Sequence, residues 1–160
     1  MVFAMRPALA GIVVSCLLGA SLAAAQEVKG KGHVVYVPHS TETFKLADGT
    51  PAMRMQSKGV VLAADPATSI HLSTQDCSGT YVMNVDGTMR TASGYCDGID
   101  KDGHVWWIWW KGNQAGSNWG FLGGTGKYEG IKGGGTTKTE MQAADGRLVI
   151  SWEGNWTTTK

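Results

Sequence analysis

Apolar residues at helical spacing are nearly absent from this sequence of 160 residues. Short runs rich in Val, Ile, Thr, Tyr and Trp occur instead, and they are separated by Gly, Asp and Asn. Such runs are typical of β-strands joined by turns. The sequence therefore predicts an all-β protein.

Clusters of Lys and Arg are also missing. The chain has 14 basic and 13 acidic residues, and without Arg6, which lies in the N-terminal segment considered below, the two signs balance. Nucleic acids and anionic membranes select clustered positive charge. A neutral, well-mixed surface therefore predicts that nucleic acid is not a partner.

Motifs for metal, nucleotide or nucleophilic chemistry are absent as well. The cysteines form no Cys-x-x-Cys pair, and no serine stands in a Gly-x-Ser-x-Gly motif. Four histidines lack the spacing of metal ligands and are expected on the surface or in strands. They are His33, His39, His71 and His104. The sequence therefore predicts no metal, nucleotide or haem cofactor.

The first 25 residues have the order of a secretory signal peptide. Arg6 provides the basic start, an apolar run covers 8–22, and small residues end the segment at Ala25. Cleavage there would leave 26–160, a length suited to one domain. We therefore expect an exported protein, periplasmic or secreted, with no membrane span after the signal is removed. The short, alanine-rich signal indicates a bacterial source.

Lipidation of Cys16 is the alternative use of this segment. Residues 13–16 fit the short pattern that precedes a lipidated cysteine in bacterial lipoproteins. The apolar run continues through Leu22, however, where a lipoprotein would normally turn polar. A place in the apolar core of the signal is therefore the preferred interpretation of Cys16.

Two cysteines remain outside the signal, Cys77 and Cys96, and an oxidising compartment favours a disulfide between them. An Asp-Gly pair, which is favoured in two-residue hairpin turns, lies between them at 86–87. In such a hairpin the numbers of facing residues add up to 173, and so do those of the two cysteines. Turn and disulfide thus predict one register, and the crosslink would contribute on the order of 3 kcal/mol.

The same count places the two cysteines at a hydrogen-bonded pair of the ladder. Side chains splay apart at such a pair, which is unfavourable for a disulfide. We therefore expect a β-bulge at Gly79 or Gly94.

The Asp-Gly pair recurs at 48–49, 102–103 and 145–146. At the last of these, facing residue numbers should add up to 291, which sets Thr139 against Trp152. One face of this hairpin is then apolar or Thr-rich, and the other is charged. The first face consists of Thr137, Thr139, Met141, Leu148, Ile150 and Trp152.

The strand expected at 104–110 is apolar on both faces. One face can line a barrel interior, whereas the other needs a cover, because contiguous apolar patches are uncommon on monomers. We expect Trp107 and Trp109 to point inward. A second copy of the chain or a loop of the same chain would then cover the outward face, which consists of Trp106, Ile108 and Trp110.

Counting such segments predicts eight or nine strands in mostly meandering order. They are expected near 33–37, 53–62, 69–74, 79–85, 88–95, 104–111, 117–122, 134–143 and 147–156. Closure of the sheet into a barrel would remove its exposed edges. The fold expected is therefore a single antiparallel β-barrel.

Glycine is concentrated near the C-terminus, with ten glycines among the 24 residues 112–135. A phosphate-binding loop is not predicted, because no Gly-Lys-Ser/Thr ending and no following long helix are present. The segment GGTGKYEGIKGGGT (123–136) resembles the signature of the allene oxide cyclase and dirigent superfamily. This resemblance implies an eight-stranded calycin-type barrel in which the segment crosses one end as a short helical turn. It also implies structural roles for Gly123, Gly124, Gly126 and Gly133.

Three functions fit these observations. The first is a cofactor-free barrel that binds a small, largely apolar molecule in its cavity. The second is a cofactor-free cyclase or isomerase, and the third is a structural protein whose barrel is filled by side chains. The candidate pocket residues are Tyr81, Met83, Trp107, Trp109 and Trp152. The resemblance also implies a homotrimer, and a monomer whose outer face is covered by its own loop is the alternative.

Overall fold

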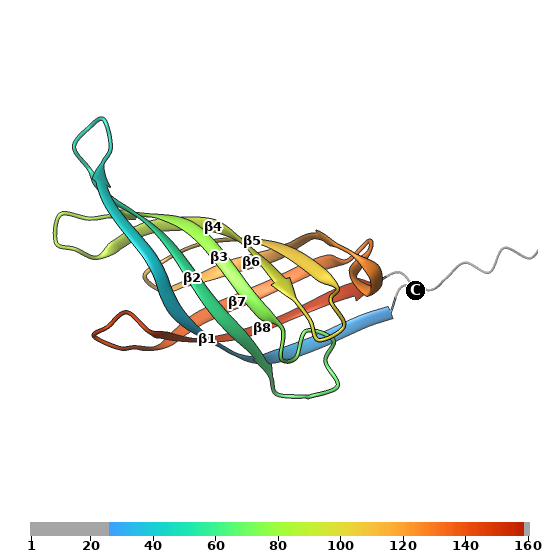
Figure 1. Cartoon of the computed structure of the whole chain (residues 1–160). Coiled ribbons are helices and arrows are strands. Elements are labelled where there is room, and N and C mark those ends of the chain that lie inside the picture. Colours follow the sequence, from blue (N-terminus) through green and yellow to red (C-terminus); the bar gives the residue numbers. More distant parts are fainter. Residues whose placement is uncertain (1–25, 159–160) are drawn as a thin grey trace, which may run out of the picture.

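Eight antiparallel strands run in an up-and-down meander through residues 26–158, the part of the chain that this computed structural model describes (Figure 1). The signal-peptide prediction for 1–25, including Cys16, lies outside the described residues. The strands are β1 (Gln26–Lys45), β2 (Pro51–Ala63), β3 (Thr74–Met83), β4 (Met89–Ile99), β5 (Val105–Asn113), β6 (Gly116–Gly124), β7 (Lys132–Gln142) and β8 (Leu148–Thr158).

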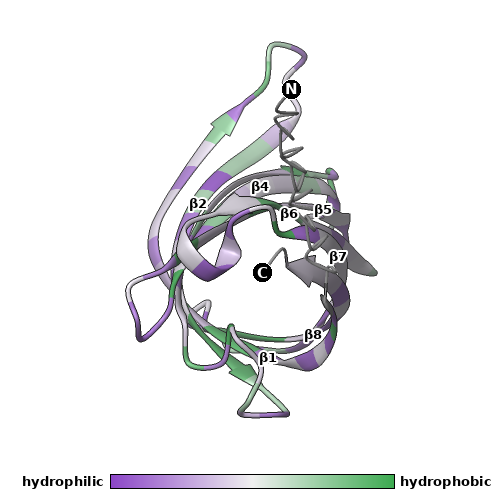
Figure 2. Cartoon of the chain, turned by 90° about the vertical axis from the view of Figure 1, so that its right-hand side faces the viewer, coloured by the Kyte–Doolittle hydropathy of each residue, from purple (hydrophilic) through white to green (hydrophobic). Residues whose placement is uncertain are grey.

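The sheet closes because β1 is long enough to pair on both sides. Its residues 26–36 pair with β8, and its residues 32–45 pair with β2. Viewed along the barrel, the strands form a ring (Figure 2). The predicted all-β, eight-stranded antiparallel barrel is thus confirmed. None of the helices in the described range is long and apolar enough to span a membrane.

The ninth candidate strand, 69–74, does not form, because residues 69–73 lie in a loop and Thr74 begins β3. The loop forms successive turns, in which His71 N–H donates to the Thr68 carbonyl and Ser73 N–H donates to the Ile70 carbonyl. Ile70 is buried against the end of the barrel. Its apolar character therefore reflects an anchored loop between β2 and β3.

All four Asp-Gly pairs build the same turn, but not the predicted two-residue turn. In each one the glycine N–H donates to the carbonyl three residues earlier, and only the glycine has a positive φ, between 80° and 85°. The positive φ of the glycine therefore makes each loop one residue longer than the predicted two-residue turn, as in a hairpin with a G1 bulge. These turns follow β1, β3, β4 and β7.

The disulfide between Cys77 and Cys96 is present, and the predicted register of β3 and β4 is confirmed. The expected bulge lies elsewhere: Gly79 pairs with Gly94 without interruption, and the register shifts between Val82 and Met83. This shift, close to the turn, changes which pairs are hydrogen-bonded. The two cysteine Cα atoms are 4.1 Å apart, which suits the closer, non-hydrogen-bonded type of pair.

The register predicted for β7 and β8 is wrong by two residues, because Thr139 faces Ile150 and Trp152 faces Thr137. A slip of two preserves the side on which each residue lies, so most of the predicted face does point inward. Met141 is the exception. A shift between Thr139 and Met141 turns Met141 outward, where it is 48% exposed.

The orientation predicted for β5 is inverted. Trp106, Ile108 and Trp110 face the interior, whereas Trp107 and Trp109 lie on the outer surface, 40% and 38% exposed. Alternation along the strand allows two settings when both faces are apolar. The pairing of β5 with β4 selects the observed one, because Ile108 lies beside the inward-facing Cys96.

Glycines make room for the tryptophans inside the barrel. A Cβ atom at Gly98 would overlap the Trp106 ring, and one at Gly154 would lie 2.6 Å from Trp119. Gly79 gives the same access to Trp110. Each ring thus packs directly against the backbone of another strand, either the adjacent one or the next but one, so a narrow barrel can hold several large aromatic side chains.

Candidate functional site

A cavity of about 160 Å³ lies inside the barrel, and its lining extends to one end of the barrel, called here the open end. The open end carries the turns that follow β1, β3, β5 and β7, and residues close to those turns, such as Pro38, Met89 and Gly146, form its rim. The opposite end, called here the closed end, carries the loops after β2, β4 and β6.

The closed end is sealed by the glycine-rich segment and the side chains beneath it. The segment forms the 3-10 turn η1 (Gly126–Tyr128), seen across the barrel end in Figure 2. Tyr128 is fully buried, and its hydroxyl donates to the Ser69 carbonyl at 2.6 Å. Trp156 and Ile131 are buried beside it in the core. The turn predicted from the resemblance is therefore present at the predicted place.

An ion pair holds this seal. Lys127 Nζ lies 2.7 Å from Asp100 Oδ2, and only 1% of the Asp100 side chain is exposed. Burial by itself raises the pKa of Asp100, but Lys127 and the N–H groups of Asp102 and His104 favour the carboxylate more strongly, so the pKa falls from 3.8 to about 2. Asp100 is thus charged at neutral pH and joins the loop after β4 to η1.

The four glycines assigned structural roles lie in or beside this seal. Gly126 and Gly133 have φ of 55° and 123°, where other residues are strained, and Gly126 packs on the His104 ring. Gly124 leaves space for Tyr128, and Gly123, with φ of 151°, lies near the outer Trp107 ring.

The cavity wall is mainly apolar and includes seven aromatic residues. Phe121 makes edge-to-face contacts with Trp119 at 5.3 Å and with Trp106 at 6.1 Å between ring centroids. Tyr81 lies 5.6 Å from Trp110. Such contacts fix the rings and leave apolar surface for a guest molecule.

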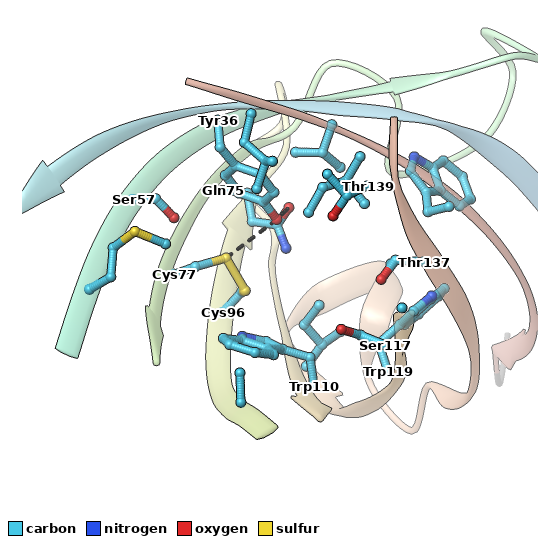
Figure 3. Close-up of a pocket in the computed structure, with 18 of the residues that line it drawn as sticks. Tyr36, Ser57, Gln75, Cys77, Cys96, Trp110, Ser117, Trp119, Thr137 and Thr139 are labelled. Atoms are coloured by element: carbon cyan, nitrogen blue, oxygen red, sulfur yellow. Dashed lines mark hydrogen bonds between the residues drawn. A yellow bond between two sulfur atoms is a disulfide. The ribbon is translucent and has the colours of Figure 1, made fainter. Parts of the chain in front are cut away.

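None of the described residues that line the cavity carries a charge. The polar contribution consists of uncharged side chains from both sides of the barrel. Figure 3 shows several of them facing the same space. They include Ser57, Gln75, Asn113, Ser117, Thr137 and Thr139.

One polar group lies against the disulfide. The Tyr36 hydroxyl donates to Gln75 Oε1 at 2.8 Å and lies 3.4 Å from Cys77 Sγ (Figure 3). Burial, and to a smaller extent Tyr81, raise the pKa of Tyr36 well above its usual value of 10, and burial raises the pKa of Tyr81 to about 12. Both phenols are therefore neutral hydrogen-bonding groups rather than bases near pH 7.

The structure brings only some of the sequence-predicted pocket residues together. Tyr81 and Trp152 line the cavity. Met83 ends β3 at the open end and is not a lining residue, although its partner Met89 is. Trp107 and Trp109 are on the outer wall, since the face of β5 is inverted.

Sequence reasoning missed Tyr36 and Gln75. Tyr36 stands in the run Val34–Val37, in which every residue is apolar or aromatic although only alternate residues face the core. The sequence of the run therefore does not indicate which side faces inward. Gln75 lies between two exposed polar residues, and only the pairing of β3 with β2 turns it inward. No local pattern marks either residue.

Metal binding receives no support from the geometry. Within residues 26–158, no group of three or more His, Cys, Asp or Glu side chains is placed to hold a metal ion. The closest concentration of charge, Asp100 and Asp102, is already paired with Lys127.

Comparison with solved structures finds the same barrel in two pterocarpan synthase dirigent proteins. GePTS1 is 14% identical, with a TM-score of 0.53 over 86% of this chain and 88% of that chain. PsPTS1 is 15% identical, with a TM-score of 0.53 over 84% of this chain and 99% of that chain. No protein-family model and no curated protein matches the sequence. The likeness shows the fold, and the barrel expected from the resemblance is confirmed.

Proposed function

We propose that this barrel binds a small, neutral, largely apolar molecule in its cavity without a cofactor. The observation that carries the proposal is the apolar cavity, partly lined by aromatic rings, in which none of the described lining residues is charged. Apolar pockets with a few placed polar groups are the usual form of small-molecule sites. A barrel filled by its own side chains would leave no such space.

A cyclase or isomerase of the dirigent type is the second candidate, and the fold likeness supports it. Proton transfer by a side chain is most efficient when the pKa of the group lies near the working pH. The cavity offers hydroxyls, amides and neutral phenols. A reaction here would therefore depend on shape and hydrogen bonding, and binding is the better-supported function.

The test uses purified protein expressed from the full sequence and the neutral dye N-phenyl-1-naphthylamine. The dye should gain fluorescence on entering the cavity, and neutral apolar compounds should compete with it. Competition by charged analogues should be much weaker, because an unpaired charge is costly to bury. Failure of the dye and of a panel of neutral compounds to bind would contradict the proposal.

A matched pair of variants locates the binding. Ala92 lines the cavity, whereas the next residue, Ser93, is exposed on the outer wall. Ala92→Phe should reduce dye affinity at least tenfold, and Ser93→Phe should leave it unchanged. Thr139→Trp, at the exposed rim, provides a second block if Ala92→Phe proves too crowded to fold.

We further propose that the protein is exported with cleavage after Ala25. The Cys77–Cys96 disulfide supports this, because such bonds persist in oxidising compartments. Intact mass measurement of the protein recovered from cells should give a chain that begins at Gln26. A lipid-modified N-terminus at Cys16 would favour the lipoprotein alternative.

A further inference from the structure

We infer that the ligand of this cavity carries a neutral hydrogen-bond acceptor oxygen, such as a ketone or ether, which the side-chain amide of Gln75 binds. The inference rests on the proposed function and names the chemical class of the ligand. It also assigns a binding role to a residue that no sequence motif marks.

Gln75 is a buried polar side chain whose amide oxygen already has a hydrogen-bond partner. It is 3% exposed, and its Oε1 accepts the hydrogen bond from Tyr36. Its Nε2 group makes none of the side-chain hydrogen bonds found among the described residues, and it is not one of the sealed atoms without a partner, so it keeps surface open to the cavity. Since Tyr36 sets the orientation of the amide, Nε2 presents two N–H donors toward the cavity.

The surroundings of this amide suit an acceptor. In Figure 3 Gln75 projects into the space that Ser117, Thr137 and Thr139 face from the opposite wall. The Cys77–Cys96 disulfide lies beside it and cannot donate a hydrogen bond. A guest that covers this donor without accepting from it would leave a buried N–H unpaired, which costs free energy, and a ligand oxygen avoids that cost.

The Trp152 indole and the hydroxyl groups of the wall discriminate less. The Trp152 indole N–H is sealed within the wall and has no accessible surface for a ligand. Serine and threonine hydroxyls can either donate or accept, so they select neither kind of ligand group. Gln75 Nε2 is a donor only, so it selects an acceptor.

The acceptor should be uncharged. A carboxylate would also accept from Gln75, but no described Lys, Arg or His lines the cavity to balance its charge. Removing a carboxylate from water without a counter-charge is far more costly than removing a ketone. The site therefore favours a ketone or ether oxygen on an apolar frame.

The experiment compares acetophenone with α-methylstyrene, in which a CH₂ group replaces the carbonyl oxygen with little change of shape. Dissociation constants are measured by NMR titration of the purified protein. Acetophenone should bind about fivefold more tightly, the effect of one hydrogen bond. The Gln75 side-chain N–H resonances should shift with acetophenone and much less with α-methylstyrene.

Gln75→Leu should then weaken acetophenone binding until the two constants are equal, while α-methylstyrene still binds and shows that the cavity is intact. Gln56→Leu, at an exposed glutamine of the outer wall, is the matched control and should preserve the fivefold difference. If Gln75→Leu does not fold, the resonance shifts in the unmodified protein decide.

The outcomes separate the two proposals. Binding of neither compound, together with failure of the dye, overturns the proposed function. Equal binding of both by the unmodified protein, or a preference that survives Gln75→Leu, overturns the role of Gln75 while the cavity remains a binding site.

Discussion

At the scale of single residues, glycine and tryptophan act as pairs. The chain has 23 glycines and 7 tryptophans, and the two types meet between different strands. Inside the barrel Gly98 underlies Trp106 and Gly79 underlies Trp110, and outside it Gly120 underlies Trp109. The high glycine content thus serves close packing in the strands as well as turns.

Gly98→Ala tests this pairing. The new methyl group would overlap the Trp106 ring, which is 2% exposed and cannot move freely. We expect the free energy of unfolding to fall by about 1–3 kcal/mol, the usual cost of overpacking, as measured by urea denaturation. In the Trp106→Leu background the same substitution should cost much less, and equal costs in both backgrounds would exclude the ring as the cause.

Asp100 makes the seal of the closed end sensitive to acid. Its pKa is about 2 in the folded protein and near 3.8 without these contacts, so the carboxylate stabilises the fold above pH 4. That contribution, on the order of 2 kcal/mol, is lost as the pH falls from about 4 to about 2.

We therefore expect Asp100→Asn to lower stability at pH 7 and to flatten the pH dependence of the free energy of unfolding below pH 4. Asp76→Asn removes an exposed ion pair with Lys58 and should change stability at pH 7 by no more than about 1 kcal/mol. An unchanged acid profile in Asp100→Asn would show that other carboxylates control acid unfolding.

At the scale of elements, the four identical Asp-Gly turns set the hairpin connections. Their glycines have φ near +80°, and a Cβ at Gly87 would meet nothing within 4 Å. A substitution there therefore isolates the backbone cost from any steric clash.

Gly87→Ala should lower the free energy of unfolding by about 1 kcal/mol, the cost of the left-handed conformation for a residue with a side chain. Val85→Ala, in the same turn at a fully exposed position, should have almost no effect. Both variants should bind the dye normally, and a loss of binding in Gly87→Ala would mean that the turn also shapes the cavity.

At the scale of the whole molecule, the outer face of β4–β6 is exposed. The apolar residues there are Tyr95, Trp107, Trp109 and Leu122, each at least 38% exposed. None of the described loops buries these side chains. The structure therefore does not show the arrangement in which a loop of the same chain covers the outer face of β5. Association with another copy would bury these side chains.

We expect the protein to self-associate through this face, with a homotrimer as the form implied by the resemblance. Sedimentation equilibrium measures the mass, and Trp109→Lys should shift it toward the monomer, because a charge would then be buried at the contact. Lys111→Glu, farther along the same strand, is the control. A monomer at high concentration would contradict the prediction and leave the face open to solvent.

Sequence alone determined the features that depend on local chemistry or simple counting. Alternating short runs and turn residues predicted the strands, and the shared sum of 173 predicted the Cys77–Cys96 register. The face of β8 that contains Ile150 and Trp152 was also correct despite the slipped register, because a shift of two residues conserves sidedness.

Tertiary structure decided which face of a strand points into the barrel where the alternation of residues fits either orientation. In β5 both settings bury apolar residues, so only pairing with β4 turned Trp106 and Trp110 inward and Trp107 and Trp109 outward. Gln75 resembles its exposed neighbours in sequence, and it becomes a cavity donor only through the register of β3 and the hydrogen bond from Tyr36. Strand sequence specifies which residues share a face, whereas closure of the barrel specifies which face is inside.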